Sequence, residues 1–387
     1  MASEKCLLWL FAISIFDFMS CDSTPKKLRL ELVQVIFRHG ERSPSKYETY
    51  RVTKDYKNIE ELWGFGQLTN KGKLQEYKLG EMLRKRYNDF LSDTYRPDHV
   101  YAYSSNFDRT KMSLQLVLAS LFPPTSELIW KKELNWIPIP IHSVPTKLDP
   151  LFYLDSCPNY QQLYAQLLET RRFKSFLQKF QDVFDYLKTW YPDERFELQH
   201  LFELYTFINI QISRNSSLPD WYNVNVHHRI AQGAKLYLDS LSYTPALARI
   251  TGGPLVRLML ENSQAKIDNL DARKIHLFSG HEYTVDAVTK AHNVTLQKSP
   301  PFGSAFIHET HKDELGNAYI KLFYWSGIMH ELNQLYLTGC DKSCPVEEYK
   351  KLVRPVLPSD EEIRCIYSNL SPADLQQIVM NNKPYSL

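Results

Sequence analysis

The segment 38–44, RHGERSP, places one histidine between two arginines. A neutral imidazole such as that of His39 can attack phosphorus. The guanidinium groups of Arg38 and Arg42 can hold the oxygens of a phosphate dianion through forked, charge-assisted hydrogen bonds. The segment is therefore predicted to bind a phosphate group and to attack it.

The residues before this segment explain how its side chains are positioned. The apolar run 32–37 is typical of a buried strand. Gly40 and Pro44 end that strand and expose the polar side chains between them. We expect the histidine and the two arginines at the carboxyl end of a core strand.

A second polar cluster, FSGHE at 278–282, also ends an apolar strand and opens a helix. Such a junction is an anion site, because unpaired backbone amides and the helix dipole face the ligand. His281 could donate a hydrogen bond to phosphate. Glu282 could protonate the leaving oxygen, provided that it lies within hydrogen-bond distance of it.

With both clusters in view, the chain resembles the histidine acid phosphatases, whose R-H-G-x-R-x-P signature is met at all five specified positions. The resemblance covers about 28–364 and includes GFGQLT at 64–69, where Thr69 is a good helix N-cap. It makes His39 the nucleophile, which forms a phosphohistidine, and implies no metal and no other cofactor. The segment SSNFDRT at 104–110 resembles the family stretch whose arginine is a third phosphate ligand, and the resemblance gives that role to Arg109.

The family's His-Asp pair falls on His281 and Glu282, so the carboxyl group here reaches one methylene further. The resemblance assigns the proton transfer to Glu282. Asp286 lies one helical turn later on the same face and is an alternative proton donor. We interpret it instead as a surface or capping carboxylate.

Strand and helix patterns alternate in the first third of the chain, with strands at 30–38 and 99–104 and helices at 70–88 and 108–121. Proline-rich extended chain follows, and then long helical patterns without strand signals. The last third returns to strand and helix, at 274–278 and 285–291, and to a hairpin of 305–310 with 318–324 across a turn at 315–317. This order predicts an α/β fold: a mostly parallel central sheet flanked by helices on both faces, with an inserted, mainly helical cap subdomain at roughly 150–245.

Composition is that of a globular protein, with 43% hydrophobic and 23% charged residues and a formal net charge of +2. The 387 residues suffice for one large domain with an insertion. Basic residues are spread along the chain, so we expect no nucleic-acid partner. The oligomeric state is open, with a homodimer as one option.

The N-terminus has the layout of a secretory signal peptide: Lys5, an apolar stretch at 7–16 and small residues between Ser20 and Thr24. We therefore expect a signal peptide at 1–23 and the phosphatase domain at 24–387; a buried N-terminal helix is the alternative. No later segment has the apolar length of a membrane helix, and the tail 382–387 is polar, so no membrane anchor is expected. The expected location is secreted or lysosomal.

Four cysteines follow the leader region, Cys157, Cys340, Cys344 and Cys365, and they allow three pairings. The short loop between them favours a Cys340–Cys344 disulfide, which leaves Cys157 with Cys365; a zinc site is the alternative. Three tripeptides are acceptors for N-glycosylation, at Asn215, Asn293 and Asn369.

These observations predict a phosphatase that hydrolyses small phosphate monoesters, releasing an alcohol and inorganic phosphate. A phytase or a mutase on the same scaffold is one alternative, and the R-x-P extension and export argue against the mutase. A binding glycoprotein with weakened catalysis is another, favoured only by Glu282. Assays with inositol hexakisphosphate and with an aryl phosphate at acid pH distinguish them.

Overall fold

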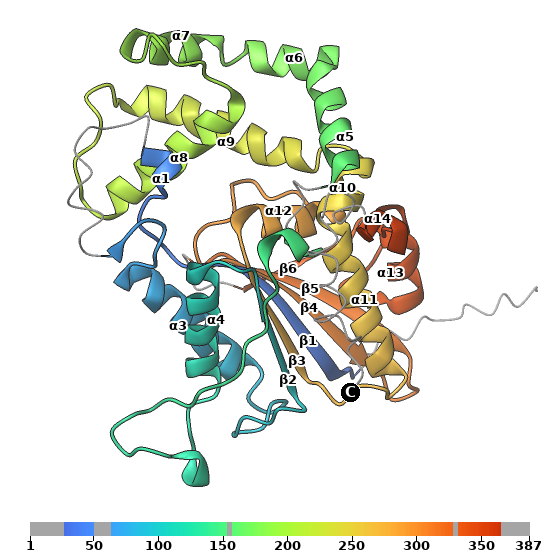
Figure 1. Ribbon diagram of the computed structural model, residues 1–387. Coiled ribbons are helices and arrows are strands. Elements are labelled where there is room, and N and C mark those ends of the chain that lie inside the picture. The colour runs from blue at the N-terminus through green and yellow to red at the C-terminus, as the bar shows by residue number, and fades with distance from the viewer. Residues whose placement is uncertain (1–26, 50–62, 153–156, 328–331, 365–387) are drawn as a thin grey trace, which may run out of the picture.

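The computed structural model describes residues 27–49, 63–152, 157–327 and 332–364. A seven-stranded sheet runs through the centre of these residues (Figure 1). Its strands are β1 (Arg29–Arg38), β2 (Val100–Ser104), β3 (Ile275–Gly280), β4 (Ala305–Lys312), β5 (Ala318–Trp325), β6 (Leu332–Leu335) and β7 (Cys344–Pro345).

The helices that flank the sheet are α3 (Asn70–Arg86), α4 (Asp108–Leu121), α10 (Pro245–Thr251), α11 (Gly253–Ile267), α12 (Glu282–Ala291), α13 (Val346–Val353) and α14 (Asp360–Arg364). Between them lie α5 (Pro158–Glu169), α6 (Arg171–Gln178), α7 (Gln181–Trp190), α8 (Leu198–Ser213) and α9 (Val224–Leu241). The short helix α1 (Lys46–Thr49) lies away from the sheet, against α8 (Figure 1). Short 3₁₀ turns occur at Ser126–Leu128, Thr146–Leu148 and Arg354–Val356.

The strand order is β2-β3-β1-β4-β5-β6, with β7 also paired to β5. The α/β class is confirmed, but the prediction of a mostly parallel sheet was wrong. Only β2–β3 and β3–β1 are parallel among the described pairs, and β4, β5, β6 and β7 all join antiparallel.

The loop before β4 explains this reversal. After α12 the chain returns to the carboxyl end of β1, where the backbone N–H of Arg38 donates to the carbonyl of Ser304 at 2.9 Å and that of Gly303 donates to the carbonyl of His39 at 3.3 Å. Strand β4 therefore starts where β1 ends and must run the other way. The predicted hairpin is confirmed, with Gly316 at φ +84° in its turn.

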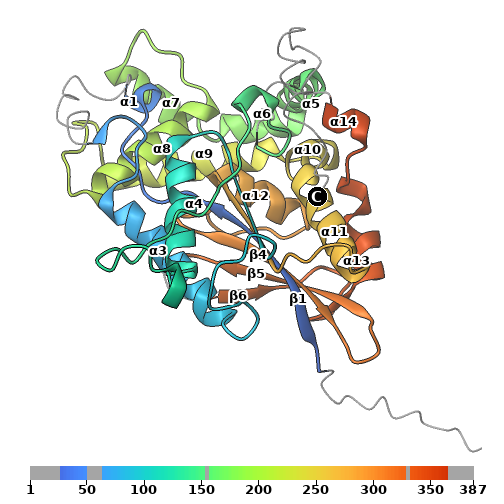
Figure 2. The same ribbon diagram turned by 60° about the horizontal axis from the view of Figure 1, so that its bottom comes forward.

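Helices cover both faces of the sheet (Figures 1 and 2). Alternate residues of β1 point to opposite faces, so Val35 and Phe37 pack with α3 and α4, whereas Ile36 packs with α11 and α12. Each of these residues is fully buried. The predicted arrangement of helices on both faces is confirmed.

Helices α5 to α9 form a separate layer above the carboxyl ends of β1, β2 and β3 (Figure 1). Buried side chains of these helices, among them Phe173, Leu201 and Phe207, form a second hydrophobic cluster with Trp221 of the loop between α8 and α9 and with Leu247 and Ile250 of α10. None of the helices in the described part of the chain is long and apolar enough to cross a membrane. The expected signal peptide at 1–23 lies outside the described residues.

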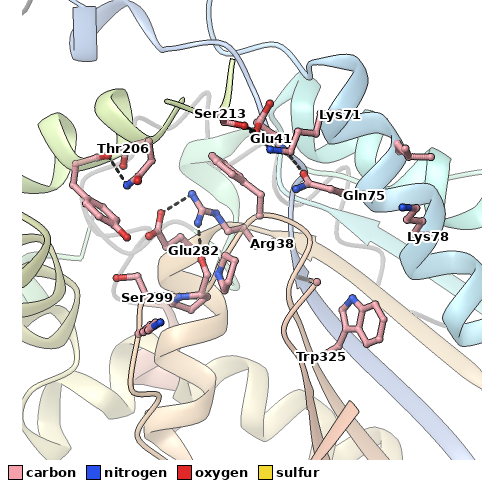
Figure 3. A pocket seen from close by; sticks show the side chains of 18 residues that line it. Arg38, Glu41, Lys71, Gln75, Lys78, Thr206, Ser213, Glu282, Ser299 and Trp325 are labelled. Atoms are coloured by element: carbon pink, nitrogen blue, oxygen red, sulfur yellow. Dashed lines mark hydrogen bonds and ion pairs between the residues drawn. The ribbon is translucent and has the colours of Figure 1, made fainter. Parts of the chain in front are cut away.

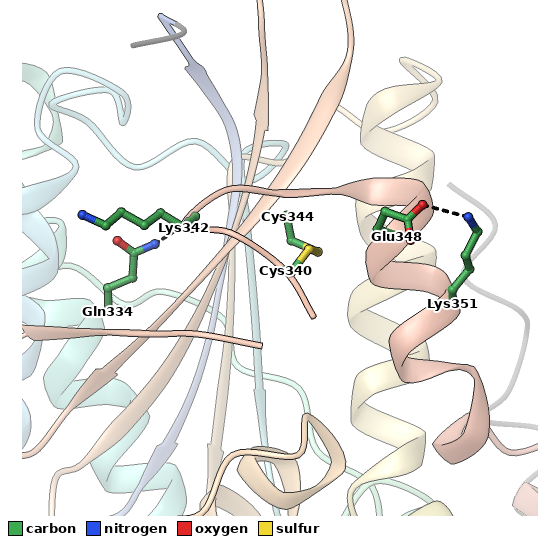
Figure 4. The surroundings of a disulfide bond; sticks show 6 residues. All are labelled: Gln334, Cys340, Lys342, Cys344, Glu348 and Lys351. Atoms are coloured by element: carbon green, nitrogen blue, oxygen red, sulfur yellow. Dashed lines mark hydrogen bonds and ion pairs between the residues drawn. A yellow bond between two sulfur atoms is a disulfide. The ribbon is translucent and has the colours of Figure 1, made fainter. Parts of the chain in front are cut away.

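A disulfide joins Cys340 to Cys344, as predicted, with Cα atoms 5.3 Å apart beside the start of α13 (Figure 4). Cys157 is disulfide-bonded. Because Cys365 lies outside the described residues, its pairing with Cys157 stays a prediction.

Of the three predicted glycosylation acceptors, Asn215 and Asn293 are exposed, and Asn369 lies outside the described residues.

Candidate active site

The predicted site residues meet at the carboxyl edge of the three parallel-paired strands. Arg38 is the last residue of β1 and lies beside Gly280 at the end of β3, which in turn is flanked by β2. His39 and His281 directly follow β1 and β3, and their ring centroids are 5.6 Å apart. Open α/β sheets bind ligands at this edge, because the strand ends and the following helix N-termini converge there.

The hydrogen bonds of His39 define the tautomer of its ring. Its Nδ1 lies 2.8 Å from the carbonyl oxygen of Gly40, which can only accept, so Nδ1 carries the proton. The Nε–H of Arg109 donates to His39 Nε2 at 3.1 Å, so Nε2 carries the lone pair. Burial, with Arg109 and His281 nearby, holds the pKa of His39 well below its usual value of 6.5. The ring is therefore neutral and nucleophilic at Nε2.

The backbone around His39 is held against the first turn of α3. A Cβ atom added to Gly40 would lie 2.3 Å from the carbonyl oxygen of Gly72, and one added to Gly72 would lie 1.9 Å from that of Glu41. Thr69, the N-cap of α3, also donates through Oγ1 to the carboxylate of Glu41 at 3.0 Å. Both glycines are required here by close approach of two backbones.

Arg42 is held by a partner that the sequence did not indicate. Its two terminal nitrogens donate to the two carboxylate oxygens of Glu48 at 2.8 and 2.6 Å, and both side chains are buried. Burial acts to lower the pKa of Arg42, but the charge of Glu48 and its hydrogen bonds to the guanidinium raise that pKa above its usual value. The Nε–H of Arg42 is buried and has no hydrogen-bond partner among the described residues.

Arg109, at the start of α4, lies with its guanidinium 4.6 Å from the ring of Phe107. Burial and the nearby charge of Arg42 lower its pKa to about 10. It remains cationic at any acid or neutral pH. The structure thus brings Arg38, Arg42 and Arg109 to the histidine that they were predicted to surround.

Arg38 and Glu282 form a buried ion pair, with Nη2 and Oε2 2.8 Å apart (Figure 3). Arg38 also donates through Nη1 to the carbonyl of Pro300 at 2.5 Å, and its guanidinium lies 3.9 Å from the ring centroid of Phe302. Burial raises the pKa of Glu282 above its usual value, and the attraction of Arg38 only partly offsets that effect. Glu282 is therefore a carboxyl group suited to carry a proton in the acid range.

The interpretation of Asp286 as a surface or capping carboxylate was wrong. Asp286 is only 2% exposed and forms an ion pair with Lys290 one turn later on α12. Its helical spacing from Glu282 was visible in the sequence. Its burial results from the packing of α12 between the sheet and α9, which the sequence pattern alone did not show.

His281 is the N-cap residue of α12, and its backbone N–H donates to Thr284 Oγ1 at 3.1 Å. Its Nε2 lies 3.0 Å from Ser105 Oγ, and its ring stacks on that of Tyr283 at 5.2 Å. Burial and the surrounding arginines keep its pKa well below 6.5, so the ring is neutral. Ser105 was missed in the sequence, although it precedes Arg109 in the matched segment 104–110.

A cavity of about 570 Å³ opens from Arg38 and Glu282 (Figure 3). One wall is the face of α3 that carries Lys71, Leu74, Gln75 and Lys78; the opposite wall is the face of α8 that carries Tyr205, Thr206, Asn209 and Ser213. The loop 298–302 and Trp325 close the remaining side. The helical layer thus supplies part of the lining of the pocket.

Comparison with known proteins supports the same interpretation. Residues 29–324 match the model of the histidine phosphatase superfamily, branch 2. The chain is 34% identical over 368 residues to venom acid phosphatase Acph-1 of Apis mellifera, covering 91% of this chain and 93% of that protein. It is 35% identical over 355 residues to prostatic acid phosphatase of Rattus norvegicus, covering 89% and 91% respectively.

It is also 31% identical over 356 residues to lysosomal acid phosphatase of Homo sapiens, covering 90% of this chain and 83% of that protein. Among solved structures, the apo form of Hafnia alvei phytase superposes with a TM-score of 0.68 at 18% identity, covering 88% of this chain and 99% of that one. A Bifidobacterium longum multiple inositol polyphosphate phosphatase superposes with a TM-score of 0.54 at 14% identity, covering 89% and 96%. The structural likeness shows the fold, and the sequence matches show that this chain belongs to the histidine phosphatase superfamily, branch 2.

Proposed function

We propose that this protein is an acid phosphatase, which hydrolyses small phosphate monoesters through a phosphohistidine intermediate on His39. The observation that carries the proposal is the tautomer of His39. Gly40 accepts from Nδ1 and Arg109 donates to Nε2, so a neutral ring presents its lone pair among arginines. A nucleophile of this kind needs an electrophile whose oxygens the arginines can hold, and a phosphate monoester fits.

In the first step, His39 Nε2 attacks phosphorus, the N–P bond forms and the bond from phosphorus to the leaving oxygen breaks. Arg38, Arg42, Arg109 and His281 hold the remaining phosphate oxygens, over which negative charge is spread in the transition state. Glu282 gives its proton to the leaving oxygen, so that an alcohol departs. In the second step water attacks the phosphorus of the phosphohistidine and Glu282 takes the proton from that water. The O–P bond forms, the N–P bond to His39 breaks, and inorganic phosphate is released.

The Arg38–Glu282 pair couples substrate binding to the protonation of Glu282. A phosphate dianion beside Arg38 competes for the guanidinium and adds a like charge near the carboxylate. Both effects raise the pKa of a carboxyl group. Binding of the substrate therefore favours the protonated form of Glu282 that the first step needs, and it does so best at acid pH.

The test is hydrolysis of 4-nitrophenyl phosphate by the purified protein between pH 4 and 8. We expect turnover that is highest at acid pH and absent in His39→Ala. Wild-type enzyme denatured at alkaline pH during turnover should carry phosphate on His39. Turnover by His39→Ala at the wild-type rate, or phosphate trapped on another residue, would exclude the mechanism. Inositol hexakisphosphate assayed in parallel tests the phytase alternative.

We also propose that residues 1–23 are a signal peptide and that the protein is secreted or lysosomal. The Cys340–Cys344 disulfide supports this, because such bonds persist in oxidising compartments. Exposed Asn215 and Asn293 are proposed as glycosylation sites. A mobility shift after peptide N-glycosidase treatment of the protein from the medium or lysosomes of expressing cells would support both points, and retention in the cytosol would contradict them.

A further inference from the structure

The charges that line the cavity beside Arg38 and Glu282 are not all neutralised by each other. Six charged side chains contribute to its lining: Arg38, Glu41, Lys71, Lys78, Glu282 and Lys298. Arg38 pairs with Glu282, and Lys71 lies 3.2 Å from the carboxylate of Glu41. Lys78 and Lys298 form no ion pair or hydrogen bond with any residue that the structure describes.

The two unpaired lysines come from different elements. Lys78 lies on the cavity-lining face of α3, two turns beyond Lys71, as Figure 3 shows. Lys298 lies in the loop that leads through Pro300 to β4, the loop whose carbonyl holds Arg38. Both side chains are exposed, so they face solvent at the cavity rather than the protein core. Two cations on separate walls create a positive field in the space between them.

The carboxylates of the cavity do not cancel this field. Glu41 also accepts hydrogen bonds from Thr69 and from Ser213 of α8, in addition to its pair with Lys71. Glu41 is 3% exposed, and its hydrogen bond with Ser213 joins α8 to the loop that follows His39. Glu282 is also buried, and its carboxylate forms an ion pair with Arg38. The outer part of the cavity therefore holds uncompensated positive charge.

Apolar side chains line the same cavity as the two lysines: Leu74, Tyr205, Phe302 and Trp325. Phe302 also lies against Arg38, whose guanidinium is 3.9 Å from the ring centroid. A leaving group in this cavity would place an apolar body against these walls. A second anionic group on it would be attracted by the two lysines of the lining.

We propose that the leaving-group side of this pocket selects phosphate monoesters whose alcohol has an apolar body and carries an additional negative charge, a carboxylate or a second phosphate. Lys78 and Lys298 are the specificity-determining residues. The inference rests on the proposed phosphatase function, which it makes more specific. Two exposed ion pairs of ordinary strength should together favour the anionic substrate by ~2-fold to ~30-fold in kcat/KM at low salt.

The test compares 4-carboxyphenyl phosphate with 4-carbamoylphenyl phosphate, which differ in charge but hardly in size. The measured quantity is the ratio of their kcat/KM values at pH 6 in low salt. We expect this ratio to fall ~2-fold to ~30-fold in the double variant Lys78→Met/Lys298→Met and to fall in wild type as salt is raised. Because each ratio is taken within one protein, any loss of folded enzyme cancels.

Lys73→Met is the matched control, because Lys73 lies on the same helix but lines a different surface groove with Lys111 and Trp136. It should keep the wild-type ratio. The inference is overturned if the double variant keeps the wild-type ratio, or if Lys73→Met lowers the ratio as much. The carbamoyl substrate alone reports the proposed function, so hydrolysis of both substrates with an unchanged ratio rejects the specificity and leaves the phosphatase standing.

Discussion

A buried histidine remote from the active site should limit the stability of this protein in acid. His308 lies in the middle of β4, paired with Gln34 of β1 and Leu322 of β5, and its side chain is fully buried. Neither ring nitrogen has a hydrogen-bond partner in the described structure. Burial, with the nearby His292, lowers the pKa of His308 from 6.5 to about 3.

The size of the effect follows from linkage. The unfolded chain binds a proton at His308 below pH 6.5, whereas the folded protein does so only below about pH 3. The stability contributed by the neutral ring is present above pH 6.5 and is lost as pH falls from 6.5 towards 3. Between pH 7.5 and pH 5 the loss is about 2 kcal/mol, and at pH 4 it is about 3 kcal/mol.

The variant His308→Leu removes the titrating group and the two unpartnered nitrogens. We expect the free energy of unfolding, measured by urea titration, to fall between pH 7.5 and pH 5 by about 2 kcal/mol less in the variant than in wild type. Each protein is compared with itself at the two pH values, so a change in packing at neutral pH cancels. His276 and His292, whose pKa values burial lowers to about 3 and about 4, still contribute to the loss in both proteins.

His228→Gln is the control, because this histidine is exposed on α9 and its replacement is expected to preserve the wild-type pH dependence. Parallel curves of unfolding free energy against pH for wild type and His308→Leu would refute the reasoning. They would show that His308 has the same pKa in the folded and unfolded chains.

Three further predictions concern the active site. Glu282→Ala should slow alkyl phosphates ~100-fold to ~10,000-fold and aryl phosphates much less, because phenolates leave without a proton; equal slowing of both in steady-state assays would reassign the acid. Arg42→Ala should weaken inhibition by inorganic phosphate or vanadate as well as turnover, and Glu48→Gln should do the same to a smaller extent because it loosens Arg42; unchanged inhibition constants would remove Arg42 from the pocket. Gly72→Ala should lower both the melting temperature and kcat, because its Cβ would displace the backbone of Glu41, and a fully active variant would show that the loop can move aside.

Local patterns of the sequence were sufficient for the chemistry and for most of the elements. The apolar runs before His39 and His281 are strands, because a buried strand must be apolar on both faces, and both histidines follow those strands directly. Helices α3 and α4 begin at the predicted residues, Asn70 and Asp108. These features depend on neighbours within a few positions, so the sequence expresses them directly.

The sequence did not show features that depend on residues far apart in the chain. Strand β4 runs antiparallel to β1 because the loop 300–304 hydrogen-bonds at the end of β1, some 260 residues away. Glu48 had no motif of its own, and its role arises only from where α1 places it against Arg42. Asp286 is buried because α12 is covered by α9, which local periodicity did not show.

The sequence by itself thus determined which residues can do phosphoryl chemistry and which strand ends carry them. Only the tertiary structure decided how they are arranged: Arg109 donates to Nε2 of His39, Arg38 pairs with Glu282, and α3 and α8 line the cavity beside that pair. The physical reason is that protonation state, ion pairing and pocket shape depend on distances and burial. Those quantities are set when segments far apart in the chain pack together.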